Sequence, residues 1–129
     1  MQIDARCNVI TGEIIGAALE IHRALGPGLL ESPYVNCLRY ELSQRRLRFA
    51  SEVGVPLTYK GQELGYSYRV DLIVENLVIV EVKAVESVLA VHKAQTLTYM
   101  KLAACPLGLL INFNEARLID GVHRLINPA

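Results

Sequence analysis

The sequence lacks any uninterrupted apolar run approaching the roughly 18 residues of a membrane span, although 52% of its 129 residues are apolar. Its start also lacks the basic-then-apolar pattern of a secretory signal, since Asp4 and Arg6 lie among the first residues. Repeats, linkers and low-complexity segments are missing as well. We therefore expect one cytoplasmic domain over residues 1–129, away from membranes and long enough to bury a core.

Cysteine is scarce, and its spacing is uninformative. The three cysteines Cys7, Cys37 and Cys105 have an odd count and no CxxC spacing. A disulfide framework or a zinc site is therefore not expected, and we interpret these residues as small buried or half-buried side chains.

An excess of positive charge is also absent, because 13 basic residues balance 13 acidic ones. Proteins that grip duplex nucleic acid regardless of sequence usually carry a basic surface, so the balance argues against avid binding of that kind. The cluster of Arg45, Arg46 and Arg48 has two interpretations. It could meet a phosphate backbone, or it forms the solvated, dipole-favoured end of a helix, which we favour.

The most informative stretch is Tyr68–Lys83, where two runs rich in Val, Ile and Leu are broken at Glu75-Asn76. Such runs predict two antiparallel strands joined by a turn. Three charged residues interrupt the apolar pattern: Asp71 in the first strand, and Glu81 and Lys83 in the second. Because side chains alternate along a strand, Glu81 and Lys83 point to the same face.

Whether Asp71 joins that face depends on the length of the turn. A two-residue turn would pair Asp71 with Val80 and place Glu81 on the other face. A three-residue turn over Glu75–Leu77 pairs Asp71 with Glu81 instead. We predict the longer turn, which usually needs one residue in a left-handed conformation, and Asn76 tolerates that conformation.

Burying these charges costs several kcal/mol for each group unless they are paired or bind a metal. One interpretation is a salt bridge from Lys83 to Glu81 or Asp71. The other is a hard-metal site, since two carboxylates suit Mg²⁺ or Mn²⁺. Lys83 could then orient or deprotonate an attacking water beside a phosphoryl group.

The spacing Asp71, then Glu81-Val82-Lys83, resembles the catalytic signature of the PD-(D/E)XK nuclease superfamily. The usual proline before the aspartate is replaced by Val70. The resemblance implies that Asp71 and Glu81 hold the metal and that Lys83 assists the water.

A helix is predicted over Val88–Ala103, because apolar residues recur there without Pro or Gly. Gln95 and Tyr99 are four residues apart and therefore lie on one face. This spacing is similar to the QxxxY element of RecB-like nucleases in the same superfamily. Read alone, it also fits an exposed Gln beside a half-buried Tyr. His92 shares roughly that face and is either a phosphate contact or an ordinary surface histidine.

Upstream, Gly28, Glu31 and Tyr34 match the signature of the small bacterial GxxExxY family of that superfamily. The resemblance extends to Tyr-Arg-Val-Asp at 68–71 and to residues 109–114. It implies that Glu31 joins Asp71 and Glu81 at the metal, although a carboxylate at a helix start is also explained by the dipole. Tyr34, Arg69 and His92 are the candidate substrate contacts.

The remaining elements predict an α/β fold with a mixed sheet. Its parts, in order, are helices at Val9–Leu25 and Leu30–Arg46, strands at Phe49–Val53, Val55–Tyr59 and Leu64–Tyr68, the hairpin, the helix described above, a buried strand at Leu107–Phe113 with a parallel neighbour, and a short strand at Val122–Ile126. The order agrees with the restriction-endonuclease-like αβββαβ core of the resembled superfamily, with one extra N-terminal helix. On the first helix, Glu20 is either solvated or leans over the site.

The leading hypothesis is a Mg²⁺- or Mn²⁺-dependent nuclease, with DNA favoured over RNA as the substrate. In this hypothesis Gln95 and Tyr99 hold the scissile strand or orient Lys83. One rival is a non-catalytic binding or regulatory protein on the same fold. The other is a hydrolase of a small phosphate-containing substrate, which a neutral surface would suit. The alternating Tyr59, Tyr66 and Tyr68 could line a homodimer interface, stack on bases or pack against the sheet.

Overall fold

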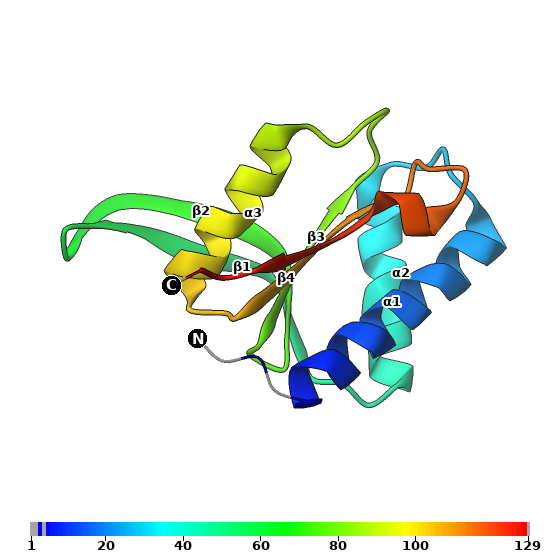
Figure 1. Ribbon diagram of the computed structural model, residues 1–129, viewed down its shortest axis with the longest axis horizontal. Coiled ribbons are helices and arrows are strands. Elements are labelled where there is room, and N and C mark those ends of the chain that lie inside the picture. Colours follow the sequence, from blue (N-terminus) through cyan, green and yellow to red (C-terminus); the bar gives the residue numbers. More distant parts are fainter. Residues whose placement is uncertain (1–2, 4, 129) are drawn as a thin grey trace.

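A five-stranded mixed sheet runs through the middle of the molecule (Figure 1). The computed structural model describes residue 3 and residues 5–128. The elements, in chain order, are α1 (Ala5–Leu25), α2 (Glu31–Gln44), β1 (Phe49–Tyr59), β2 (Gln62–Val74), β3 (Val78–Lys83), α3 (Ala90–Ala103), β4 (Leu107–Asn112), the short 3₁₀ helix η1 (Leu118–Gly121) and β5 (Val122–Ile126). The predicted α/β class, with a restriction-endonuclease-like order of elements, is confirmed.

The strands lie in the order β1-β2-β3-β4-β5, and only β3 and β4 are parallel. Every residue of β4 is buried. A strand covered on both faces needs no alternation of polar and apolar residues, and this is why its sequence reads as a continuous apolar run. The predicted parallel neighbour is therefore confirmed, and it is β3, the strand that carries Glu81 and Lys83.

Helices cover both faces of the sheet. α1 and α2 pack on one face of the sheet. There the apolar side chains of the two helices and those of Leu72, Val80 and Leu109 form the larger core. α3 packs on the other face, where Met100 meets Ile79 and Val70. Figure 1 shows α3 on the side of the sheet away from α1 and α2. The strand that carries Glu81 thus lies between two packed layers.

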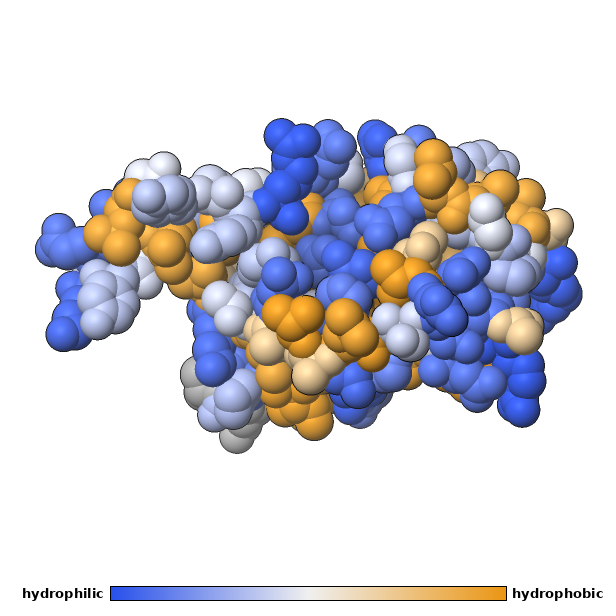
Figure 2. Space-filling model, turned by 90° about the horizontal axis from the view of Figure 1, so that it is seen from above, coloured by the Kyte–Doolittle hydropathy of each residue, from blue (hydrophilic) through white to orange (hydrophobic). Residues whose placement is uncertain are grey.

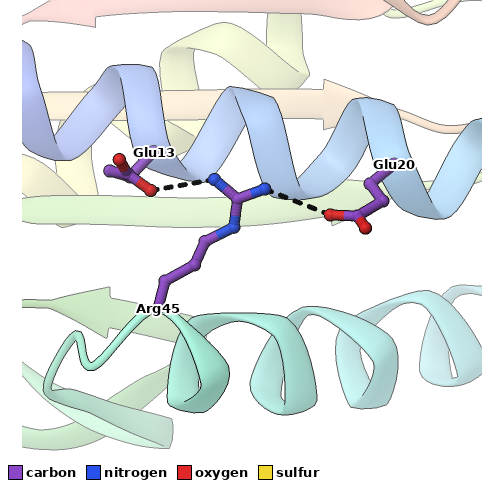
Figure 3. A network of polar contacts seen from close by, with 3 residues as sticks. All are labelled: Glu13, Glu20 and Arg45. Atoms are coloured by element: carbon purple, nitrogen blue, oxygen red, sulfur yellow. Dashed lines mark hydrogen bonds and ion pairs between the residues drawn. The ribbon is translucent and has the colours of Figure 1, made fainter.

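The two N-terminal helices are joined by an ion-pair network that Figure 3 shows from close by. Arg45, at the end of α2, reaches α1 and contacts Glu13 at 2.8 Å and Glu20 at 3.1 Å. The guanidinium passes over Gly16, where a Cβ would lie 3.2 Å from Nη1. Arg45 caps the C-terminal end of α2, which agrees with the favoured interpretation of a helix end, but its guanidinium is not simply solvated, because it pairs with Glu13 and Glu20 of α1.

β1 and β2 continue past the core as a two-stranded arm, visible at the left of Figure 1. Residues 58–69 of the arm are all exposed. The two strands of the arm are joined by a turn at Lys60-Gly61, where both residues have positive φ. The prediction that separate strands flank Gly54 is wrong, because Gly54 lies within the single strand β1 and pairs with Arg69, and the register with β2 shifts only farther along, between Pro56 and Thr58. The prediction of a separate strand at residues 64–68 is wrong for the same reason.

The helix boundaries are close to those predicted. α2 begins at Glu31, with Pro33 in its first turn, where proline is tolerated, and ends before Arg46, whose φ of 60° leaves the helical region. α1 begins four residues earlier than predicted, and α3 begins two residues later. Within the described part of the chain, no helix combines the length and apolarity that crossing a membrane requires.

Candidate active site

The hairpin between β2 and β3 has the predicted register. Leu72 pairs with Val80 and Val74 with Val78, so the turn is Glu75–Leu77. Both Glu75 and Asn76 are left-handed, with φ of 52° and 55°. The predicted three-residue turn is therefore confirmed, and the same register brings Asp71 opposite Glu81.

At that position, backbone N–H groups donate to the carboxylates of Asp71 and Glu81 instead of to backbone carbonyls. The Asp71 N–H donates to Glu81 Oε1 at 3.3 Å, and the Val82 N–H donates to Asp71 Oδ2 at 2.8 Å. Each carboxylate is thus held by a backbone amide of the opposite strand. These bonds fix both side chains on a rigid part of the sheet, beside each other.

The electrostatic environment of Glu81 is unfavourable for a negative charge. Only 6% of the surface of Glu81 is exposed to solvent. Burial, followed by the neighbouring charge of Asp71, raises the pKa of Glu81 to about 8, while the charge of Lys83 acts in the opposite direction. Two acids that share a site in this way favour a proton or a cation between them.

Lys83 lies two residues beyond Glu81 on β3, and its side chain is half-buried. No ion pair within 4.0 Å joins it to Asp71 or Glu81 in the described structure. The salt-bridge interpretation of the three charges is therefore not what the structure shows. Strand alternation places Lys83 on the same face of β3 as Glu81, and within the described residues its ammonium group is not paired with either carboxylate.

Two adjacent oxygen ligands are a donor set that fits Mg²⁺ or Mn²⁺, ions that keep several of their waters. Asp71 also lines a hollow of about 190 Å³ together with Glu31, Arg39, Ser51 and Glu52. Across residues 3 and 5–128, no three Asp, Glu, His or Cys side chains converge closely enough to hold a metal by themselves. Glu31 therefore faces the same hollow as Asp71 without forming a three-carboxylate cluster.

Gln95 and Tyr99 lie on one face of α3, as predicted, where they line a hollow of about 270 Å³ with Tyr68, Ala94 and Thr98. The rings of Tyr68 and Tyr99 meet at 5.7 Å between centroids. Burial raises the pKa of Tyr99, and the negative charges of Glu81 and Asp71 contribute. Tyr99 packs in the cluster that contains Ile79, so α3 brings this hollow to the face of the sheet on which strand alternation places Glu81.

Tyr34 has a structural position. Its side chain is fully buried and stacks on Phe113 with centroids 4.4 Å apart. Its hydroxyl donates to the Gly26 carbonyl at 2.6 Å and accepts from the Leu29 N–H. The prediction that Tyr34 contacts substrate is wrong, because this tyrosine ties the loop before α2 to the core.

The other two candidate contacts differ from each other. His92 Nδ1 accepts the Leu89 N–H at 3.0 Å and so caps the first turn of α3. Arg69 is exposed on β2, adjacent to Tyr68 but on the opposite face of the strand. Among the described residues, neither side chain forms a hydrogen bond or an ion pair with Asp71 or Glu81.

Sequence reasoning missed Asn112, a fully buried amide at the end of β4. Its Nδ2 donates to the Val85 carbonyl at 2.9 Å, and its Oδ1 accepts the Val85 N–H at 3.1 Å. This pair of bonds fixes the segment that follows Lys83. The signal was present in the sequence, because an amide at the end of an otherwise apolar strand needs a partner.

Glu52 was also missed. It lies in β1 between the pairs Ser51–Leu72 and Val53–Val70, and therefore opposite Asp71, with a φ of 51°. A left-handed glutamate inside a strand is strained, and such residues concentrate at functional sites. Nothing in the sequence marks this conformation.

Comparison with known proteins agrees with the geometry. A search of curated proteins and a search of solved structures gave no significant match. The family model described as PD-(D/E)XK nuclease superfamily matches residues 8–125. That range includes the hairpin, the carboxylate pair, Lys83 and α3. The narrower resemblance to the GxxExxY family stays a prediction. On this match and the element order, the chain belongs to the PD-(D/E)XK nuclease superfamily.

Proposed function

We propose that the protein is a metal-dependent phosphodiesterase that hydrolyses nucleic acid. The observation that carries the proposal is the carboxylate pair of Asp71 and Glu81, held side by side by backbone amides near a lysine that forms no ion pair within the described residues. A structural salt bridge would have paired that lysine. The unfavourable charge at Glu81 is the condition that a bound cation relieves.

Asp71 and Glu81 would hold Mg²⁺ or Mn²⁺, the ions that their oxygen donors suit. When bound, such an ion stabilises negative charge on a phosphoryl oxygen and lowers the pKa of a bound water. Glu31 faces the hollow beside Asp71 and would act through water molecules, since it does not form a cluster with the other two acids.

Lys83 would orient the attacking water and take part in its deprotonation. Lys83 is a half-buried residue on the same face of β3 as Glu81, and no carboxylate of the described residues forms an ion pair with it. Asn112 supports this arrangement by fixing the chain at Val85, two residues beyond the lysine. Gln95 and Tyr99 would hold the strand beside the carboxylates.

DNA is the first substrate to test, followed by RNA. The balanced charge of the chain favours a substrate contacted at few phosphates over one gripped along a duplex. A homodimer through the exposed Tyr59 and Tyr66 of the arm would add further surface for nucleic acid. These choices rest on the resemblance and on the charge balance.

The test uses labelled single- and double-stranded DNA and RNA, incubated with the protein in Mg²⁺ or Mn²⁺. The Glu81→Gln and Lys83→Ala variants are prepared identically, and Glu41→Gln and Lys101→Ala are the matched controls. Wild type and both controls should cleave, whereas the two site variants should not. Chelation of the metal should stop cleavage and its re-addition should restore it.

The outcomes separate the alternatives. Cleavage that survives Glu81→Gln and Lys83→Ala would contradict the proposed site. Absence of cleavage from folded wild type, combined with metal-dependent hydrolysis of a small phosphodiester, would indicate the small-substrate enzyme. Tight binding of nucleic acid without any hydrolysis would indicate the binding protein.

A further inference from the structure

The hollow beside Tyr99 has the composition of a site for a planar ring. Tyr68, Gln95, Thr98 and Tyr99 line it, with Ala94 as a small residue on the helix side. Its volume of about 270 Å³ lies just below the range of pockets that enclose drug-sized ligands. Tyr68, which packs against Tyr99 in the hollow, remains 41% exposed. Part of this tyrosine is therefore accessible to a ligand.

The side chains of Thr98 and Gln95, which both line the hollow, differ in whether they already take part in a hydrogen bond. The Thr98 hydroxyl donates to the Ala94 carbonyl at 3.1 Å and is occupied within the helix. The Gln95 amide is exposed and has no hydrogen-bond partner among the residues that the structure describes. An amide offers both donors and an acceptor, which is what the edge of a nucleobase requires.

The hollow adjoins the carboxylates. Tyr99 forms its wall and packs in the same apolar cluster as Ile79, and strand alternation places Glu81 on the face of β3 that carries Ile79. Asp71, opposite Glu81 on β2, lines the separate hollow beside Glu31. Farther out, Tyr66 is 67% exposed, and strand alternation places it on the face of Tyr68. Figure 2, seen from above, shows the arm projecting from this part of the molecule with apolar and polar side chains intermixed.

We infer that this hollow binds one unpaired nucleobase of the strand whose phosphate lies at Asp71 and Glu81, with the base stacked on Tyr68 and hydrogen-bonded by the Gln95 amide. This inference rests on the proposed function, and it names the substrate class as single-stranded nucleic acid or strands with unpaired nucleotides. A base within a duplex has both faces stacked and its pairing edge occupied, so it cannot enter. Stacking on one aromatic ring strengthens binding by about tenfold or more per base.

The test measures binding, so that it does not depend on hydrolysis. A series of short oligodeoxynucleotides is used, each with a single 2-aminopurine at a different position of the strand. The fluorescence of this base falls when it stacks. The oligodeoxynucleotides are titrated in Mg²⁺ into the Lys83→Ala variant, which keeps both carboxylates. One strand position should show quenching, and an abasic nucleotide at that position should weaken binding about tenfold. A duplex of the same sequence should bind more weakly than the single strand.

Tyr68 substitutions in the same Lys83→Ala background identify the ring. Tyr68→Phe keeps an aromatic face and should keep both quenching and affinity. Tyr68→Leu keeps apolar packing against α3 but should lose the quenching and about tenfold in affinity, and the abasic nucleotide should then cost nothing more. Circular dichroism checks that each variant is folded. If the Leu variant is not folded, the test rests on the Tyr68→Phe variant, which must keep both the quenching and the affinity.

Several results would overturn the inference. They are equal binding by the Phe and Leu variants, tolerance of an abasic nucleotide at every position, equal affinity for duplex, or no binding of the single strand. Its failure is distinguishable from that of the proposed function. Cleavage by wild type that is indifferent to Tyr68 leaves the nuclease without the base site, whereas a stacked strand that is never cut leaves the base site without the nuclease.

Discussion

Two pairs of acidic residues in this protein have opposite surroundings. Glu13 and Glu20 on α1 have side chains that are 43% and 56% exposed, and Arg45 lies between them. Asp71 and Glu81 lie side by side in the sheet, partly or fully buried, and no arginine or lysine forms an ion pair with them in the described part of the chain. A cation of the protein itself thus pairs with both acids on α1, whereas within the described residues none pairs with the two acids in the sheet.

The difference separates a structural role from a chemical one. An arginine that joins two exposed carboxylates holds two helices together at little electrostatic cost. Two adjacent carboxylates without a cation destabilise the metal-free protein, because burial and mutual repulsion disfavour their charges. A fold retains such an arrangement where ligand binding relieves it. The surroundings, rather than the residue type, indicate where function lies.

The largest expected effect comes from removing one charge of the buried pair. Asp71→Asn keeps the shape of the side chain and its bond to the Val82 N–H, but it removes the charge that holds a cation. We expect kcat/KM for hydrolysis to fall by about 10³-fold. Steady-state kinetics measures this, with Glu20→Gln as the matched acid on α1, for which less than about a twofold change is expected. Equal losses in the two variants would remove the distinction between the pairs.

The next effect concerns stability and pH in the absence of metal. The pKa of Glu81 rises from 4.5 to about 8 on folding, so between these values only the unfolded state is ionised there. The stability that the protonated Glu81 provides is complete below pH 4.5 and is lost as pH rises toward 8. Near pH 8, Glu81→Gln should be more stable than wild type by on the order of 2 kcal/mol.

Urea unfolding of chelator-treated protein, measured from pH 5 to pH 9, tests this expectation. The difference in the free energy of unfolding between Glu81→Gln and wild type should grow with pH and then level off. Excess Mg²⁺ should reduce it by stabilising wild type alone. A difference that is independent of pH would contradict the raised pKa of Glu81.

The exposed network should respond more weakly. Arg45→Ala should lower the free energy of unfolding by roughly 1 kcal/mol, because all three charged side chains keep contact with water and screening reduces their interaction. Urea unfolding measures the change, with Arg46→Ala as the control. Hydrolytic activity should be unaffected at temperatures where the variant is folded. A loss of activity would show that the two regions are coupled.

The smallest effect is expected within that network. Glu20→Gln should cost only a few tenths of a kcal/mol, since Glu20 is the more exposed acid and has the longer contact with Arg45. Glu13→Gln should cost more. Adding salt to the urea titrations should shrink both differences. The reverse order would mean that packing around Gly16, rather than charge, sets the strength of the contact.

Much of the site was predictable, because its geometry follows from strand periodicity. The parity of a hairpin register depends only on the length of its turn, and Asn76 indicated a turn with a left-handed residue. The position of Asp71 opposite Glu81 followed from that. Helical spacing likewise predicted that Gln95 and Tyr99 lie on one face of α3. The unbroken apolar run of β4 predicted that this strand is buried.

What failed depended on contacts between distant segments. Tyr34 has the composition of a substrate contact, yet its stacking on Phe113 involves a partner 79 positions away in the chain. No local pattern shows whether an aromatic residue faces the core or the site. The continuous arm was missed because Gly54 reads as a break until its pairing with Arg69 is known. Glu52 was missed because its left-handed backbone is set by the surrounding sheet.

Calorimetric titration of Mn²⁺ into metal-free protein is the measurement that tests the central claim most directly. Wild type at pH 7 should bind the ion saturably and release protons, because the ion replaces the proton that Glu81 holds below about pH 8. Titrations in buffers of different ionisation enthalpy count those protons. Asp71→Asn and Glu81→Gln should lose the binding, and Glu13→Gln should keep it. Binding that is absent from wild type, or unchanged in Asp71→Asn and Glu81→Gln, would contradict the account.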